Sequence, residues 1–337
     1  MKPRFSALLL FVVSLATAPF AALPGWAQTA TRSGAPAASG NPIAANPLKV
    51  ALLHWYKADT VTNFGVGNEP NGVAFDGTNI WTANFGAGTV TKLAANDGTV
   101  LGTFTIGAGF EPYGIAFDGA NIWVSNAGAA SVTKLQASTG KVLGTFTVGS
   151  NPAFMTFDGA NIWVPNGTNT LTKLRASDGK NLGNFTVSFS PISTAFDGTY
   201  VWVVCGGTSG GVVSKVQPSD GTVVGTYSVG TAPTGIAFDG ANMWVANRGD
   251  GTVTKLQASN GDVLGTFQLR PGMGPYDVAF DGSNIWVTSS GGVAELRASD
   301  GETLGVFQTP SLNTAGIAFD GAYMWVAGYN KGIVSKF

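Results

Sequence analysis

The segment Gly-Ile-Ala-Phe-Asp-Gly-Ala-Asn-Ile-Trp-Val, residues 114–124, decides the fold because close copies of it recur along the chain. Its centre, Phe-Asp-Gly, occurs seven times at spacings of 39 to 42 residues, and a tryptophan follows six residues after each phenylalanine. A period of this length is typical of an array of supersecondary units. The seven copies begin at Phe75, Phe117, Phe157, Phe196, Phe238, Phe280 and Phe319.

Each period contains four short apolar runs separated by turn residues. In the second repeat we predict strands over residues 113–117, 121–125, 131–135 and 142–148, with Asp-Gly and Thr-Gly pairs at the turns between them. A proline precedes most first strands, where no ladder donor is lost. No stretch of the repeats shows a helical period. The pattern predicts an all-β fold, a seven-bladed β-propeller of four-stranded blades.

The seventh repeat indicates how the ring closes. It contains only three predicted strands, the third over residues 333–337, while residues 60–66 match a fourth strand that lacks its own repeat. We therefore predict that this N-terminal strand completes the last blade, which removes an exposed sheet edge.

The composition excludes several kinds of chemistry. Only 11% of the 337 residues are charged and the net charge is −1, whereas a nucleic-acid-binding protein needs a basic stripe. The single Cys205 excludes an intrachain disulfide framework, and the single His54 excludes a multi-histidine metal site. Stacked blades cover their strands on both sides, which explains the low charge.

The N-terminal region has the pattern of an export signal. Lys2 and Arg4 precede an apolar run over residues 7–16, too short to span a bilayer, and a small-residue site allows cleavage after Ala27. We predict a signal peptide over 1–27, a flexible Ala/Ser/Pro-rich tether over 28–47 and the propeller over 48–337, with repeat cores beginning near 70, 112, 152, 191, 233, 275 and 314. The expected location is secreted or periplasmic.

The repeated Gly-Ile-Ala-Phe-Asp-Gly-Ala-Asn-Ile-Trp-Val, followed by Thr-Val-Thr-Lys-Leu, resembles bacterial seven-bladed propellers of the YVTN/NHL-repeat and streptogramin (virginiamycin B) lyase-like group. The resemblance covers residues 58–337. It implies a scaffold shared by noncatalytic surface or periplasmic proteins, lyases and lactonases. Streptogramin lyases are metal-assisted and place His and Glu near the axis, but no repeat here contains a histidine.

Positions that recur in all or most of the repeats are interpreted as structural. The lysines of Thr-Lys-Leu, such as Lys92 and Lys134, are expected to reach solvent or pair with a turn aspartate. Cys205 is expected to be an inert, partly buried thiol, and Pro165 to cause a local bulge. The Phe-Asp-Gly aspartates are predicted to cap their own hairpin turns, namely Asp76, Asp118, Asp158, Asp197, Asp239, Asp281 and Asp320.

Positions that differ between repeats are better candidates for a single asymmetric site. Around the recurring proline on one face, we predict a ligand-binding rim from Glu69, Asn71, Glu111, Tyr113, Arg248, Tyr276 and Asp277. If a divalent cation is bound, Glu69 and Glu111 are its expected ligands, with Asp277 nearby. A solvated rim of ordinary loop residues is the simpler interpretation.

These observations favour an exported, noncatalytic propeller that presents one face to a protein or small polar ligand. The alternative is a metal-assisted lyase or lactone hydrolase, and a surface-layer or adhesive role is a third possibility. No catalytic residue and no cofactor other than that possible cation are predicted. We expect a monomer, without a nucleic-acid partner or a membrane span.

Overall fold

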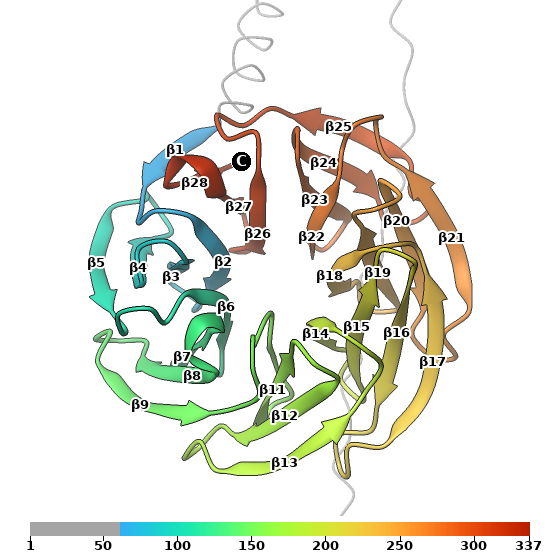
Figure 1. Ribbon diagram of the computed structural model, residues 1–337. Coiled ribbons are helices and arrows are strands. Elements are labelled where there is room, and N and C mark those ends of the chain that lie inside the picture. Colours follow the sequence, from blue (N-terminus) through green and yellow to red (C-terminus); the bar gives the residue numbers. More distant parts are fainter. Residues whose placement is uncertain (1–60) are drawn as a thin grey trace, which may run out of the picture. The chain divides into compact units, whose positions relative to one another are not determined.

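The computed structural model describes residues 61–337, which form seven four-stranded antiparallel sheets (Figure 1). Each sheet is one blade, and the first strands of successive blades contact one another around the ring. The predicted fold class is therefore confirmed. His54, the predicted signal peptide and the predicted tether lie outside the described residues.

The first four blades follow one another without interruption. Blade 1 contains β2 (Pro70–Phe75), β3 (Asn79–Asn84), β4 (Thr89–Ala94) and β5 (Val100–Thr105). Blade 2 contains β6 (Pro112–Phe117), β7 (Asn121–Asn126), β8 (Ser131–Gln136) and β9 (Val142–Thr147), with the short 3-10 helix η1 (Ala127–Ala129) between β7 and β8. Blade 3 contains β10 (Thr156–Phe157), β11 (Asn161–Asn166), β12 (Thr170–Arg175) and β13 (Asn181–Thr186). Blade 4 contains β14 (Pro191–Phe196), β15 (Val201–Gly207), β16 (Gly210–Val216) and β17 (Val223–Val229).

The last three blades complete the ring. Blade 5 contains β18 (Pro233–Phe238), β19 (Asn242–Asn247), β20 (Thr252–Gln257) and β21 (Val263–Gln268). Blade 6 contains β22 (Pro275–Phe280), β23 (Asn284–Ser289), β24 (Gly292–Arg297) and β25 (Thr303–Phe307). Blade 7 contains β26 (Thr314–Phe319), β27 (Met324–Gly328), β28 (Ile333–Lys336) and β1 (Thr62–Gly65), with the 3-10 helix η2 (Tyr329–Lys331) before β28.

The ring closes by pairing strands from opposite ends of the described chain. β1 runs antiparallel to β28, with Phe64 opposite Val334, and the two strands lie side by side in blue and red in Figure 1. Phe64 stacks on Trp325 with ring centroids 5.5 Å apart. The prediction that an N-terminal strand completes the last blade is confirmed.

Antiparallel strands give the ring two faces with different connections. The turn face carries the Asp-Gly turns between first and second strands and the turns between third and fourth strands. The loop face carries the loops between second and third strands and the connections from one blade to the next. First strands crowd around the axis, so a Cβ on Gly114 would lie 2.5 Å from the carbonyl oxygen of Ala153. This close approach explains why most blades carry glycine at this position.

Each Phe-Asp-Gly aspartate organises the turn face of its own blade. Asp118 Oδ1 accepts hydrogen bonds from the backbone N–H groups of Ala120 and Asn121, and Oδ2 accepts one from Trp123 Nε1 at 2.7 Å. Burial opposes ionisation of Asp118, but these hydrogen bonds outweigh it and hold the pKa of the carboxyl below its usual value. The same tryptophan–aspartate bond occurs in all seven blades.

The lysines of the third strands do not behave as expected. Lys134 is only 6% exposed, and its Nζ donates to the carbonyl oxygens of Ala176 and Ser177 in the next blade. The ammonium also lies 4.9 Å from the centroid of the Trp123 ring. The prediction of solvent exposure or pairing with a turn aspartate is wrong, because the indole face and the neighbouring carbonyls satisfy the cation inside the interface.

Two single residues were singled out by sequence. Cys205 is fully buried, and burial raises the pKa of its thiol to about 12, which makes it unreactive. Pro165 causes no register shift between β11 and β12, contrary to expectation. The Pro165 carbonyl oxygen accepts a hydrogen bond from the Ala153 N–H on the first strand. Because the N–H and C=O of one residue point to the same neighbour in an antiparallel sheet, the N–H that proline lacks is also missing on this side. On this side the first strand, β10, is only two residues long. Among residues 61–337 no helix has the length and apolar character needed to cross a membrane.

Candidate functional site

The blade connections on the loop face share one backbone hydrogen bond. The residue before the recurring proline accepts a hydrogen bond from the N–H of the first residue after the second strand, as Glu111 does from Ala127 at 3.0 Å. Five of these residues have positive φ values between 45° and 52° without being glycine, which is a strained conformation. They are Glu69, Glu111, Asn151, Ser190 and Ala232. This hydrogen bond holds two side-chain positions of each repeat at the mouth of the central channel.

These two positions build a cavity of about 250 Å³ on the loop face. One is the second residue of the first strand, here called the strand position, and the other is the first residue after the second strand, here called the loop position. The strand position contributes Asn71, Tyr113, Tyr276 and Ala315, and the loop position contributes Phe85, Arg248, Ser290 and Tyr329. Gly274, Asn313 and Thr314 complete the lining.

A hydrogen bond crosses the channel mouth inside this cavity. The hydroxyl groups of Tyr113 in blade 2 and Tyr276 in blade 6 lie 2.5 Å apart. Tyr276 also donates to Asn71 Oδ1 at 3.4 Å. Burial, followed by the neighbouring Tyr113, raises the pKa of Tyr276 well above its usual value, so the Tyr276 phenol is protonated at neutral pH. Because blades 2 and 6 are not neighbours, this pair closes the mouth from opposite sides.

An aromatic side chain and a carboxylate lie beneath the tyrosine pair. Phe154 contacts Tyr113 and Tyr276, with ring centroids 5.0 Å and 6.1 Å apart. Asp277 lines a second cavity of about 160 Å³, together with Phe154 and residues of the first strands. Its carboxylate accepts from the N–H groups of Val278 and Ile317. Desolvation by burial nevertheless dominates and raises the pKa of Asp277 to about 7.

Two glutamates flank the cavity at blades 1 and 2. Glu69 Oε2 accepts a hydrogen bond from the Tyr329 hydroxyl at 3.2 Å. Burial, followed by the charge of Glu69 and more weakly by that of Glu111, raises the pKa of Tyr329. Glu69 and Glu111 therefore act on the same tyrosine, and they make this edge of the cavity acidic.

A cation stands on the other side of the mouth. The Arg248 guanidinium is exposed and lies 5.8 Å from the centroid of the Tyr276 ring. A planar guanidinium stacked on an aromatic ring keeps its hydrogen-bond donors free for a partner. The mouth thus has a basic side at blade 5 and an acidic side at blades 1 and 2.

The structure brings most of the predicted rim together. Asn71, Tyr113, Arg248 and Tyr276 line the cavity, and Glu69 contacts its wall through Tyr329. Asp277, predicted on the rim, instead lies in the channel among first-strand residues, because neighbouring residues of a strand point in opposite directions.

The sequence interpretation missed Phe85 and Tyr329, although both occupy the repeat position of Arg248 and differ from their counterparts. Comparison of that position across all seven repeats would have found them.

The buried asparagines beside the loop position are structural. Asn84 is fully buried, and its amide nitrogen donates to the hydroxyls of Thr89 and Thr91. Asn126 and Asn247 make the same contacts in their blades. These side chains fix the loops between second and third strands, and cavity-lining residues such as Phe85 and Arg248 lie at the start of those loops.

Within residues 61–337 no three His, Cys, Asp or Glu side chains are grouped so that they would hold a metal ion. The channel residues also do not fit a divalent ion of the lyase type, because both Asp277 oxygens already accept backbone N–H groups and Phe154 is the neighbouring wall. Of the predicted carboxylates, only Glu69 and Glu111 share one part of the rim.

Comparison with known proteins places the fold among known propellers. A family model described as outer membrane protein assembly factor BamB matches residues 74–240, just under half of the chain. No curated protein matches the sequence. Hydrazine synthase from Kuenenia stuttgartiensis is similar in structure, with a TM-score of 0.72, 17% sequence identity, and coverage of 80% of this chain and 95% of that chain.

Two streptogramin-cleaving enzymes are similar to the same extent. A catalytically inactive virginiamycin B lyase from Staphylococcus aureus, in complex with quinupristin, has a TM-score of 0.70 at 17% identity and covers 82% of this chain and 98% of its own. A streptogramin B lyase has a TM-score of 0.71 at 17% identity, with 82% and 97% covered. At this identity the likeness concerns the fold, and it confirms that the chain shares the propeller of the streptogramin lyase-like group.

Proposed function

We propose that this chain is a noncatalytic binding propeller whose loop-face cavity holds a small polar ligand or a polar side chain of a partner protein. The observation that carries the proposal is the cavity of about 250 Å³ at the channel mouth. Residues that differ between blades line it, in a ring whose Phe-Asp-Gly and tryptophan positions are the same in all seven repeats. A concave site with a few convergent polar groups is the usual form of a ligand site.

The lining indicates what such a ligand offers. Arg248 supplies a cation, Asn71 and the two tyrosine hydroxyls supply neutral donors and acceptors, and Phe85 and Tyr329 supply aromatic walls. A ligand with an anionic group toward blade 5 and hydroxyl or amide groups toward the tyrosines satisfies these partners. Sugar acids, N-acetylated sugars and acidic peptides have this chemistry.

The test is a thermal-shift screen of the protein with N-acetylated sugars, uronic acids, acidic dipeptides and quinupristin. Binding only to the folded state stabilises it by about 2.7 kcal/mol at one hundred times Kd, which corresponds to a rise of roughly 5 °C in Tm for a domain of this size. We expect at least one compound to raise Tm in the wild type and in Arg175→Ala, an exposed arginine of the turn face. The rise is expected to disappear in Arg248→Ala.

Two results would contradict the proposal: no compound changes Tm, or the shift survives both Arg248→Ala and Tyr276→Phe. Cleavage of quinupristin, measured by mass spectrometry after incubation, would favour the lyase alternative instead. A parallel arm with Ca²⁺, Mg²⁺ and EDTA tests the cation hypothesis. A shift that depends on metal and is lost in Glu111→Ala would establish a metal site at the Glu69 and Glu111 edge.

We further propose that the propeller acts after export, in the periplasm or outside the cell. This proposal is supported by the signal-like pattern of residues 1–27 and by the match to a family described as an outer membrane protein assembly factor. Mass spectrometry of the N-terminus of the protein purified from its native host tests it. A mature chain that begins at Gln28 is expected, and an intact Met1 would contradict it.

A further inference from the structure

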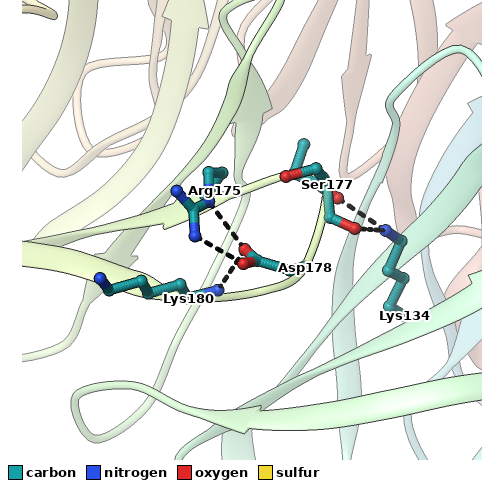
Figure 2. A network of polar contacts seen from close by, with 6 residues as sticks. Lys134, Arg175, Ser177, Asp178 and Lys180 are labelled. Carbon is teal, nitrogen blue, oxygen red and sulfur yellow. Dashed lines mark hydrogen bonds and ion pairs between the residues drawn. The ribbon is translucent and has the colours of Figure 1, made fainter.

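Six of the seven blade interfaces carry the same lysine ammonium group on the turn face, on side chains that are buried or half-buried. In each, a third-strand lysine lies over the tryptophan of its own blade, at 4.9 to 5.1 Å from the ring centroid. The ammonium donates to carbonyl oxygens in the third-to-fourth-strand turn of the next blade. Figure 2 shows this contact between Lys134 and the turn that contains Ser177. The six lysines are Lys92, Lys134, Lys173, Lys215, Lys255 and Lys336.

The interface between blades 6 and 7 departs from this arrangement in two ways. Glu295 occupies the lysine position, directly opposite Trp286, as Lys134 is opposite Trp123. In addition, the third and fourth strands of blade 7 come from distant parts of the chain, so no turn joins them and no turn carbonyls face blade 6. Both the cation and its acceptors are therefore replaced at the same interface.

A cavity of about 250 Å³ occupies this interface. Its walls include Trp286, Phe307, Met324 and Phe337, with the carboxylates of Asp281 and Glu295. The other six repeat tryptophans are 0% exposed, whereas Trp286 is partly exposed. Phe307 covers one side of Trp286 at a centroid distance of 5.2 Å, and Phe337 approaches at 6.3 Å.

The charges of this cavity are unbalanced. In blade 4 burial lowers the pKa of Lys215, and the charge of the turn aspartate Asp197 partly offsets this effect. In blade 6 the corresponding Asp281 faces Glu295, so two carboxylates repel each other. In blade 2 the Asn121 side-chain amide donates to its own turn aspartate, Asp118. In blade 6 the corresponding Asn284 amide donates instead to Glu295 Oε1, at 2.7 Å. Burial, and to a smaller extent the charge of Asp281, raises the pKa of Glu295.

We propose that the cavity between blades 6 and 7 binds an external organic cation, a primary alkylammonium group such as the side chain of a lysine on a partner protein. The indole of Trp286 and the carboxylates of Glu295 and Asp281 receive the ammonium in the place that the chain's own lysine takes in the other six interfaces. Aromatic rings beside carboxylates are the chemistry that recognises ammonium ligands. This site is separate from the proposed loop-face site, because it lies on the turn face.

The probe is n-butylammonium, which has the length and charge of a lysine side chain, with 1-butanol as its neutral counterpart. The full chain is labelled with 5-fluorotryptophan and titrated while ¹⁹F NMR spectra are recorded, and Trp286→Phe identifies the Trp286 resonance. We expect n-butylammonium to shift the Trp286 resonance saturably and 1-butanol to leave it unchanged. Glu295→Gln keeps the shape of the site but removes a charge, so affinity is expected to fall roughly three- to tenfold.

Matched variants separate this site from general surface charge. Glu302→Gln changes an exposed carboxylate of the same blade that pairs with Arg297, and binding is expected to stay unchanged. Glu295→Lys supplies an internal ammonium and is expected to abolish the response.

The proposal is overturned if the Trp286 resonance does not respond, if 1-butanol produces the same shift, or if Glu295→Gln binds as tightly as the wild type.

Discussion

The two faces of the ring are built by opposite rules. On the turn face, the contact from Asp118 to Trp123 is repeated in every blade, and the contact from Lys134 to the next blade is repeated at six of the seven interfaces. On the loop face, Tyr113, Arg248 and Tyr276 occupy positions that differ from blade to blade. Residues at the constant positions therefore hold the ring together, and residues at the variable positions make one part of the loop face different from the rest. Within residues 61–337, the lysine pattern of the turn face breaks at Glu295.

The same difference appears in two aspartates. Asp118 accepts hydrogen bonds from two backbone N–H groups of its turn, from the Asn121 amide and from Trp123, and its pKa is lowered. Asp277 also accepts backbone hydrogen bonds, but it lies in the channel, where burial dominates and raises its pKa to about 7. Ionised Asp118 thus stabilises the fold, whereas ionised Asp277 opposes it.

Removal of β1 gives the largest expected effect and tests the scaffold side of this comparison. Deletion of residues 58–67 exposes the edge of β28 and removes the stacking of Phe64 on Trp325. We expect aggregation or a large fall in Tm, measured by differential scanning calorimetry, while deletion of residues 28–47 leaves Tm unchanged. If the deleted chain does not fold, Phe64→Ala replaces it, with an expected loss of about 3 kcal/mol. Normal stability of either variant would contradict the role of β1 in closure.

The second prediction concerns the pH dependence that Asp277 produces. Because its pKa is higher in the folded chain than in the unfolded chain, stability falls as pH rises from about 4 to 7 and stays lower above pH 7. At 1.36 kcal/mol per pKa unit, ionisation of Asp277 lowers the free energy of unfolding at pH 8 by at most roughly 4 kcal/mol. Asp277→Asn removes it, so the variant is expected to gain stability relative to wild type between pH 4.5 and pH 8.

Urea unfolding at both pH values measures this difference. Asp118→Asn is the matched control with the opposite sign, because the pKa of Asp118 is lowered in the folded chain. Its stabilising ionisation is present above about pH 4 and is lost as pH falls through the folded pKa, so this variant costs more at pH 8 than at pH 3. An Asp277→Asn effect that is equal at pH 4.5 and pH 8 would contradict the assignment.

The smallest expected effect is a difference in stability between two substitutions that each remove one positive charge, one on each face of the ring. Lys134→Met removes the ammonium from Trp123 and leaves the Ala176 carbonyl without its donor, so a loss of about 1–3 kcal/mol is expected. Arg248→Ala removes an exposed cation of the loop face and is expected to change stability by less than about 0.5 kcal/mol. Urea midpoints of the two variants are compared, and equal losses would contradict the division between the faces.

The repeat pattern predicted the fold down to the origin of single strands. Phe64-Gly-Val-Gly67 matches the fourth strands of other repeats, and β1 is found where that match places it. The roles of the lysines were not predictable from one repeat, because Lys134 is satisfied by Ala176 and Ser177, residues of the next blade. A polar contact between blades leaves no sign in local propensity or periodicity.

The candidate site was partly predictable for the same reason. Tyr113, Tyr276 and Arg248 were found because they differ from their counterparts, and Phe85 and Tyr329 share that property. The position of Asp277 in the channel was not predictable from its neighbours, since Gly72 and Gly114 at the same repeat position carry no side chain to indicate a direction. The bond between Tyr113 and Tyr276 depends on the diameter of the closed ring, which no local pattern contains.

The pairing of β1 with β28 also sets an order of events in the life of each chain. During synthesis β1 emerges before any of the seven repeats, and its partner β28 at Ile333–Lys336 emerges as the last strand of the seventh repeat. The first strand must therefore wait unpaired while every blade is made, and only this most distant contact converts an open arc into a ring. Partly made chains present free strand edges that attract other chains. The edges of β1 and of the unfinished arc therefore stay free until the last strand appears.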